Sequence, residues 1–387
     1  PRITSAEFAA PAISGFLATC DDTGMAQHAI GKVPDRRHGY CLDDNARALM
    51  LVSVADVLDE AEASLWGTRF AAFINHAWNP DANRFRNFMN YGRSWCEDAG
   101  SDDANGRALW ALGHTALHGR TEELRWWARG LFDEALPIMD GIESPRAIAF
   151  ATLGAVRRLE GEPDHAGALA LVARSGELLH RLLAQSRRPD WAWFEAVLGY
   201  DNPRLSQALI EAGRITGQGE WTLAGLSSLR WIATMQISAT GQFRPVGSDT
   251  FSHPHEALPF DQQPLEAQAA IEAAASAYRA DPAQRWIDHA RAAYRWFFGG
   301  NDRGAVLADL DTGRCRDGIT PRGANRNCGA ESILAFQLAH YGVVALSREG
   351  RGDSKSSGSD PDDQSKAFHA GEILEKRRIP EKPAANF

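Results

Sequence analysis

The residues best suited to chemistry in this chain are carboxylates that stand beside aromatic rings, arginines and amides. The first such cluster covers residues 34–45 and includes His38, Tyr40 and Asp44, and Arg47 follows two residues later. These side chains can hold sugar hydroxyls, and Asp44 is also suited to act as a base or nucleophile at a glycosidic bond. The structural alternative is that Asp44 caps a helix and Arg47 pairs with a neighbouring helix.

A second cluster places four carboxylates within the seven positions of residues 97–103, and it begins two residues after Trp95. Adjacent carboxylates raise one another's pKa, and a raised pKa makes a carboxyl group a general acid. We therefore expect Asp103 to be the general acid, with Glu97 as its rival, and Arg107 to orient the substrate. The alternative is an ordinary solvated loop.

A third cluster brings two aromatic rings next to a carboxylate, in the order Trp191, Trp193, Glu195. This order suits a sugar ring that stacks beside an acid. It suits equally well a structural plug in which Glu195 pairs with a buried arginine. The sequence leaves the two interpretations open.

Two more clusters precede predicted helices. Asp261, Gln262 and Gln263 form a hydrogen-bonding helix start that could face a polyol, with Asp261 as a second candidate base, and Glu331 stands in a similar position. A pair of histidines ends at His255, but a third metal ligand is lacking nearby. A polar loop is therefore favoured over a metal site.

The chain lacks the sequence patterns of the common cofactor and nucleotide sites. A Walker loop, a GxGxxG fingerprint, a GxSxG elbow and an HExxH motif are all absent from the sequence. We therefore expect neither a cofactor nor a metal. Carboxylates with aromatic rings and arginines match glycosidic bond cleavage, in which two carboxylates flank the scissile bond.

The elements that position these residues form a repeat. Segments that resemble Asp44-Asn45-Ala46-Arg47 recur at spacings of roughly 40 to 65 residues, and each opens a run rich in alanine and leucine. The segments begin near residues 44, 103, 144, 201, 263 and 328. Six helical hairpins predict an all-α (α/α)6 toroid whose polar helix starts meet at one end; an open superhelical stack is the alternative.

The expected helices follow from the same periodicity. They cover about residues 4–19, 42–58, 62–78, 102–118, 121–136, 145–159, 165–186, 202–214, 221–236, 261–279, 281–298 and 328–346. We expect residues 1–347 to form one barrel domain. Residues 348–387 contain too few apolar side chains to offset the entropy of ordering, which predicts a disordered tail.

Charge and composition exclude several partners. The net charge of −9 is spread along the chain without a basic stripe, so nucleic acid is not an expected partner. The longest apolar runs fall short of the ~18 residues that a membrane helix needs. The five cysteines are scattered and the N-terminus lacks a signal-peptide pattern, which is typical of a cytoplasmic protein.

Four stretches resemble a bacterial family whose members are often fused to, or encoded beside, glycosyltransferases. The stretches are residues 22–28, 34–49, 101–110 and 260–267, and the resemblance covers about residues 10–346. It implies a six-hairpin glycosidase-like, carbohydrate-active fold and an association with a glycosyltransferase. The chain itself has no nucleotide-sugar Rossmann pattern, so the glycosyltransferase label belongs to the fused domain.

Together these features predict an enzyme that cleaves a glycosidic bond in an oligosaccharide, by hydrolysis or by phosphorolysis. Asp103, or its rival Glu97, would be the acid, and Asp44 or Asp261 the base or nucleophile. The remaining candidates would stack on sugar rings or orient the substrate. They are Tyr40, Trp95, Trp191 and Trp193 for stacking, and His38, Arg47, Arg107, Glu195, Gln262, Gln263 and Glu331 for orientation.

Two other functions fit the same barrel. A sugar epimerase would need acid/base histidines that face each other across the cavity, and His38 and His255 are the candidates. A noncatalytic glycan-binding partner of a glycosyltransferase would bind sugar without turnover.

Overall fold

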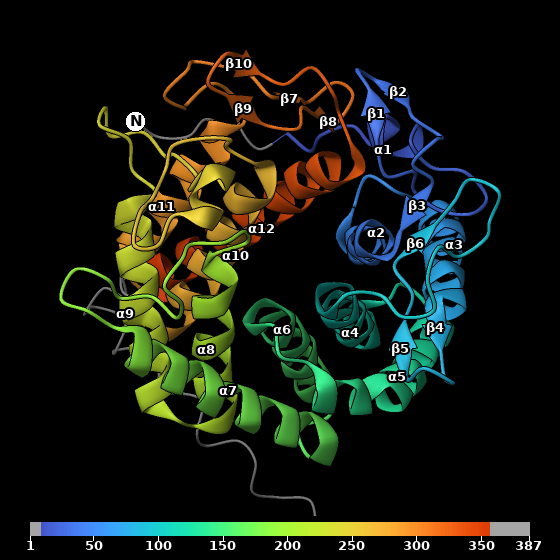
Figure 1. Cartoon of the computed structure of the whole chain (residues 1–387), viewed down its shortest axis with the longest axis horizontal. Coiled ribbons are helices and arrows are strands. Elements are labelled where there is room, and N and C mark those ends of the chain that lie inside the picture. Colours follow the sequence, from blue (N-terminus) through green and yellow to red (C-terminus); the bar gives the residue numbers. More distant parts are fainter. Residues whose placement is uncertain (1–8, 357–387) are drawn as a thin grey trace, which may run out of the picture. The chain divides into compact units, whose positions relative to one another are not determined.

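The computed structural model describes residues 9–356, and the chain divides into two compact units, Pro1–Leu346 and Ser347–Phe387. The first unit is a ring of helical hairpins (Figure 1). Its inner helices are α2 (Leu42–Val54), α4 (Asp102–His118), α6 (Pro145–Gly161), α8 (Pro203–Thr216), α10 (Pro264–Ala280) and α12 (Ala330–Ser356) up to Leu346. The outer helices are α3 (Glu60–Ala77), α5 (Glu122–Ala135), α7 (Ala166–Ser186), α9 (Gly219–Met235) and α11 (Gln284–Trp296). The predicted (α/α)6 toroid is confirmed.

The N-terminal segment differs from the prediction of a long first helix. Within the described residues this segment contains only α1 (Ser14–Leu17), and residues 1–8 lie outside the described part. The chain at and before α1 is tied to a distant loop, because the backbone N–H groups of Ala12 and Gly15 donate to the carbonyl oxygens of Leu310 and Thr312. The sixth hairpin therefore has a full inner helix and a short, loop-bound outer segment.

The predicted tail is helical where it begins. Helix α12 continues to Ser356, past residue 347, at which we expected the barrel domain to end. The rest of the predicted disordered tail, residues 357–387, lies outside the described residues.

Short polar side chains start several helices, as their sequences predict. The Ser101 hydroxyl accepts a hydrogen bond from the Ala104 N–H at the start of α4. At the start of α6, the hydroxyl of Ser144 accepts one from the Ala147 N–H. Such caps satisfy the free N–H groups of the first helical turn. At α4 the cap also fixes the point at which the helix begins, and so the position of its first-turn carboxylates, Asp102 and Asp103.

Two neighbouring inner helices, α4 and α6, pack with their backbones in contact. A Cβ atom added to Gly113 would lie 2.1 Å from the Gly154 carbonyl oxygen, and one added to Gly154 would lie 2.4 Å from the Leu109 carbonyl oxygen. Real Cβ atoms cannot approach oxygen this closely. Glycine at these positions therefore sets the distance between the two helices and narrows the ring.

The variant Gly113→Ala is expected to lower the free energy of unfolding by about 1–3 kcal/mol, because the new methyl group forces the two helices apart. Gly130→Ala on α5 is the matched control, since nothing lies within 4 Å of a Cβ there. That variant should gain about 0.5–1 kcal/mol from the better helix propensity of alanine. Urea unfolding measures both values, and equal stability of Gly113→Ala and wild type would contradict the close packing.

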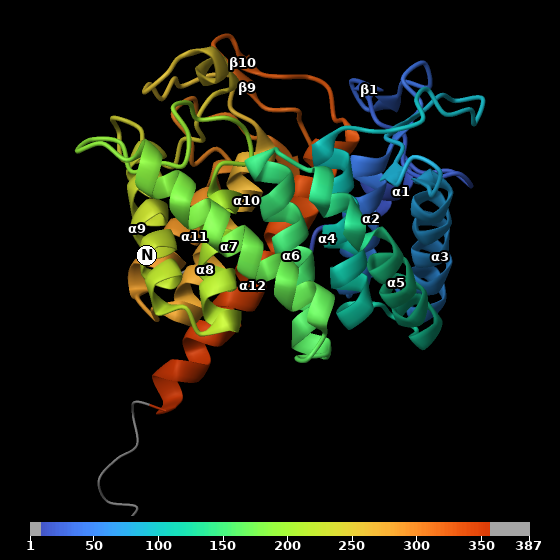
Figure 2. The same ribbon diagram turned by 60° about the horizontal axis from the view of Figure 1, so that its bottom comes forward.

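Short antiparallel strand pairs occupy the connections between helices. The pairs are β1 (Ala29–Ile30) with β2 (Val33–Pro34), β3 (Tyr40–Cys41) with β6 (Phe88–Met89), β4 (Trp78–Asn79) with β5 (Arg84–Phe85), β7 (Ala308–Asp309) with β8 (Arg314–Cys315), and β9 (Ile319–Thr320) with β10 (Gly323–Ala324). Two 3-10 turns complete the connections, η2 (Leu136–Gly141) and η3 (Ser248–Ser252). Figure 2 shows β1, β9 and β10 at one end of the ring of helices.

Candidate functional site

A cavity of about 350 Å³ lies where the inner helices begin. Its lining comes from the first two turns of α2 and α4, the first turn of α12, the residue before α10, the loop before α8, and the connections between helices. The lining residues are Gln27, His28, Cys41, Asp43, Asp44, Arg47, Phe88, Asp103, Arg107, Tyr200, Gln263, Asp317, Gly329, Glu331 and Ser332.

Asp44 is a buried carboxyl group in the first turn of α2. Burial raises its pKa to about 7, and the opposing effect of Arg47 is partly offset by the charge of Glu331. The Cys41 thiol donates a hydrogen bond to Asp44 Oδ2 over 3.0 Å. Asp44 Oδ1 lies 3.4 Å from Arg47 Nη1. Near neutral pH this group therefore exists in both its protonated and its ionised form.

Asp103 occupies the first turn of α4, the next inner helix. Its Oδ2 accepts a hydrogen bond from the Tyr200 hydroxyl, and its Oδ1 accepts one from the Ser144 hydroxyl over 3.0 Å. Burial raises the pKa of Asp103, and the charge of Arg107 acts against that rise. Because two hydroxyl groups donate to it, the local geometry suits the ionised carboxylate.

Each of the two arginines in the cavity lies between two carboxylates. Arg47 Nη1 contacts Glu331 Oε2 at 3.0 Å in addition to Asp44. Arg107 Nε lies 3.2 Å from Asp43 Oδ1, and its Nη2 lies 2.6 Å from Asp201 Oδ2. Burial opposes ionisation of Asp201, yet Arg107 and Arg204 hold its pKa below the usual range. These arginines fix the positions of carboxylates from several helices.

A histidine and a further carboxylate complete the polar lining. Partial burial and the neighbouring His38 lower the pKa of His28, so its imidazole is neutral at neutral pH. The His38 ring meets the His28 ring edge-on, with ring centroids 4.6 Å apart. Asp317 accepts the Gly329 N–H over 2.7 Å, and burial raises its pKa.

The structure brings six of the predicted site residues into this one cavity: Arg47, Asp44, Asp103, Arg107, Gln263 and Glu331. His38 lies beside it, against His28. The other predicted residues are not part of its lining: Tyr40, Trp95, Glu97, Trp191, Trp193, Glu195, Asp261 and Gln262.

Glu97, expected as a rival acid, accepts hydrogen bonds from backbone N–H groups instead. Its Oε1 accepts the N–H groups of Asn87 and Phe88 at 2.7 and 2.6 Å, which holds the loop that carries β6. Tyr40, expected to stack on sugar, is buried and donates its hydroxyl hydrogen to Asp21 over 2.6 Å. Trp95 packs edge-on against Phe73.

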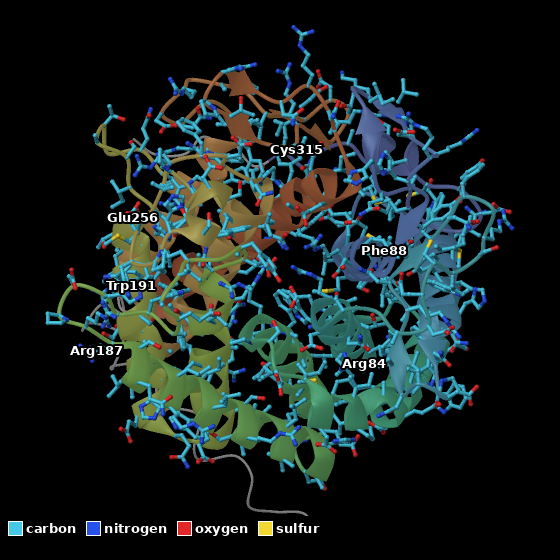
Figure 3. The ribbon with its side chains drawn as sticks, in the orientation of Figure 1. Arg84, Phe88, Arg187, Trp191, Glu256 and Cys315 are labelled. Carbon is cyan, nitrogen blue, oxygen red and sulfur yellow. The ribbon has the colours of Figure 1, made fainter. Side chains whose placement is uncertain are left out.

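The aromatic pair of the third cluster is part of the hydrophobic core. Trp191 and Trp193 are 4% and 0% exposed, and both pack against Trp231. Figure 3 places Trp191 at the periphery of the ring and Phe88 on the opposite side. Glu195 Oε2 lies 2.7 Å from Nη1 of the buried Arg146, so this cluster is a structural plug with a paired carboxylate. Neither tryptophan offers a face to a ligand.

The structure separates the side chains of the cluster at residues 261–263. Only Gln263 lines the cavity, while the fully buried Gln262 accepts the Trp296 indole N–H over 2.8 Å and donates to Asp302 over 2.9 Å. Asp261 lies outside the lining, and burial raises its pKa, with Asp249 adding to the rise. His255 packs its ring against Trp191 instead of facing the cavity.

Sequence reasoning missed Phe88, Asp317 and the cavity position of His28. Phe88 belongs to strand β6, which pairs it with Cys41, the residue before α2. Asp317 stands in a long loop rich in glycine and aspartate, where composition alone does not single it out. His28 lies in one of the stretches on which the family resemblance rests.

Two further properties concern residues 9–356 as a whole. Within them, no three or more His, Cys, Asp or Glu side chains are arranged to hold a metal ion. None of the helices in the same range has the length and apolar character of a membrane span.

The ring of helical hairpins, with a polar cavity at the starts of its inner helices, is an (α/α)6 toroid. No family model and no curated protein matches the chain. Among solved structures, it is similar to cellobiose 2-epimerase from Bacillus thermoamylovorans B4167, with 11% identity and a TM-score of 0.67 over 87% of this chain and 96% of that one. A D-mannose isomerase matches with 10% identity and a TM-score of 0.66 over 86% and 94% of the two chains.

A hydrolase has the same fold. The α-1,6-mannanase GH76A of Salegentibacter sp. HEL1_6 matches with 11% identity and a TM-score of 0.57 over 86% of this chain and 96% of that one. At these identities the similarity establishes the fold. The names of these structures do not support the expected association with a glycosyltransferase.

Proposed function

We propose that this protein hydrolyses a glycosidic bond in an oligosaccharide, with Asp44 and Asp103 as its pair of catalytic carboxyl groups. The observation that carries the proposal is that successive inner helices bring these two carboxyl groups into one cavity, in different environments. Paired carboxyl groups that differ in protonation are what acid/base cleavage of a glycoside requires.

The environments favour an exchange of the roles that the sequence suggested. Asp44, with a pKa of about 7, keeps its proton to a higher pH and is the better proton donor. Asp103 receives two hydroxyl hydrogen bonds and is the better carboxylate. In the proposed step the glycosidic C–O bond breaks, the leaving oxygen takes the Asp44 proton, and Asp103 acts as base towards water or as nucleophile. Water finally supplies the hydroxyl group of the anomeric carbon.

An inactive variant of the similar mannanase supports a role for adjacent aspartates. That variant, in which two aspartates adjacent in sequence are replaced by alanine, is described as inactive. This chain carries adjacent aspartates at two inner-helix starts, Asp43 with Asp44 and Asp102 with Asp103. Both residues of the first pair line the cavity, whereas Asp102 accepts hydrogen bonds from Arg84 and from the backbone of residues 143–144.

The proposal is tested by a turnover screen. Purified protein is incubated with manno-, gluco- and galacto-oligosaccharides, with and without phosphate, and the products are read by mass spectrometry. A shortened sugar that forms without phosphate supports hydrolysis. A phosphorylated sugar among the products would indicate phosphorolysis instead of hydrolysis. Binding without any turnover would favour the noncatalytic alternative.

Activity is expected to fall as the pH rises above about 7. The proton donor must be protonated, so the fraction of competent enzyme declines tenfold per pH unit above the Asp44 pKa of about 7. Activity should also fall at acidic pH, because Asp103 must be ionised and burial raises its pKa above the ordinary value of 3.8. The measurement is kcat/KM against pH for the best substrate of the screen. In Asp44→Asn the residual activity should lose the alkaline limb; an unchanged limb would assign it to another group.

A sugar epimerase or isomerase is the second candidate, and His28 is the observation that favours it. A neutral imidazole in the cavity can accept a proton from carbon next to a carbonyl group, and burial keeps His28 neutral. His255, which we expected to be the partner base, packs against Trp191, so Asp44 or Glu331 would have to return the proton. Chromatographic separation of the isomers in the same reactions distinguishes the two functions, because an epimerase changes the isomer composition of a sugar without changing its mass.

A further inference from the structure

The cavity carries more negative than positive charge. Its lining includes five acidic side chains and two arginines. The acidic side chains are Asp43, Asp44, Asp103, Asp317 and Glu331, and the arginines are Arg47 and Arg107. Even with Asp44 protonated the acids outnumber the arginines, and the His28 imidazole is neutral.

Both arginines already hold carboxylates. Arg47 contacts Asp44 and Glu331, while Arg107 contacts Asp43 and, behind the cavity wall, Asp201. An anion that entered the cavity would have to compete with these carboxylates for each guanidinium. Asp103 and Asp317, whose hydrogen bonds come from neutral donors, would repel it.

One aromatic side chain is available to a sugar ring. Phe88 lines the cavity and is 41% exposed, on a strand fixed by its pairing with Cys41 and by the Glu97 contact to its N–H. Phe88, the first residue of β6, is labelled in Figure 3. The other aromatic ring, Tyr200, has its hydroxyl on Asp103 and its face near the Arg146 guanidinium, 5.2 Å from the ring centroid. Phe88 therefore offers an apolar face among acidic groups.

We infer that the cavity selects its substrate by charge: it takes a neutral oligosaccharide with one ring on Phe88, binds amino sugars more tightly, and excludes uronates and phosphate. A charge inside a partly buried cavity acts through a lower dielectric than water, so the discrimination is strong. The catalytic consequence, which rests on the proposed function, is that water and not phosphate attacks the glycosidic bond.

The test measures binding, which does not depend on turnover. Three sets of sugars are used, and the members of each set share a ring configuration but differ in charge. One set is mannose, mannosamine and mannuronate, and the other two are the corresponding gluco and galacto sugars. Their dissociation constants are measured by calorimetry on the wild-type chain at neutral pH, and inorganic phosphate is titrated as a fourth probe. In the configuration that binds best, the hexosamine should bind at least about tenfold more tightly than the hexuronate, with the neutral sugar between them. Phosphate should not displace the neutral sugar.

Two variants separate charge from stacking. Asp317→Asn should reduce the ratio of hexuronate to hexosamine dissociation constants several-fold, because it removes one negative charge from the lining. Phe88→Ala should weaken all three sugars by a similar factor and leave that ratio unchanged, because it removes only the apolar face.

A hexuronate or phosphate that binds as tightly as the hexosamine overturns the inference, as does failure of every sugar to bind. An unchanged ratio in Asp317→Asn has the same consequence. Failure of the proposed function looks different: the order of affinities holds, but the turnover screen finds no shortened sugar.

Discussion

Asparagine in place of Asp103 is expected to lower kcat on the best substrate by about a thousandfold, within the range that a positioned acid/base group contributes. The substitution keeps the shape of the side chain and the hydrogen bonds of Tyr200 and Ser144 near it, but it removes the negative charge that the reaction needs. KM should change little, since one hydrogen-bonding group replaces another. The measurement is steady-state kinetics together with thermal unfolding, which should show a folded protein.

The matched control is Asp102→Asn, one residue earlier on the same helix. Asp102 contacts Arg84 at 2.8 Å and accepts backbone N–H groups outside the cavity lining. Its replacement should reduce stability by about 1 kcal/mol and leave kcat within a few-fold of the wild-type value. If both variants lose activity equally, the loss comes from the disturbed helix start and not from the chemistry of Asp103.

The architecture could be predicted because its signal repeats. Six polar helix starts, each followed by an alanine- and leucine-rich run, indicate the ring and the end at which those starts meet. The bounds of α4, Asp102–His118, coincide with the predicted helix because Ser101 caps its start and Gly119 follows its end. The first helix was predicted wrongly for the described residues, since the partner of this segment is the loop at residues 310–314, which no local pattern reveals.

The site was partly predictable for the same reason. Residues in the first turns of inner helices, such as Asp44 and Asp103, reach the cavity because the ring places them there. Residues in connections could not be assigned: Trp193 and Phe88 are both aromatic and both stand in loop-like sequence, yet one is buried and the other faces the cavity. Only the path of the chain between helices decides this difference.

Removal of the Arg107 guanidinium is expected to have the largest effect on stability. Arg107 is 5% exposed, lies between Asp43 and Asp201, and covers the Phe150 ring with its guanidinium carbon 4.0 Å from the ring centroid. In Arg107→Met the buried Asp201 would keep only the Arg204 contact at 3.3 Å. Breaking a buried ion pair from one side costs about 3–5 kcal/mol, which urea unfolding can measure.

The loss of stability in Arg107→Met should depend on pH. In the wild type Arg107 helps to hold the pKa of Asp201 low, so this contribution to stability is present above the unfolded pKa and disappears as the pH falls through the folded pKa. In Arg107→Met burial would raise that pKa, and protonation would relieve the unpaired charge. The destabilisation should therefore be smaller at mildly acidic pH than at alkaline pH.

Two further variants test whether the buried charge is the cause. Adding Asp201→Asn to Arg107→Met should recover part of the lost stability, and asparagine tolerates the positive φ of 52° at this position. Arg174→Met is the exposed control, because its pair with Asp140 lies at the surface and should contribute less than about 1 kcal/mol. If Asp201→Asn recovers no stability, the loss arises from packing against Phe150. Arg107 would then stabilise the barrel by filling space, and not by neutralising the charges of Asp43 and Asp201.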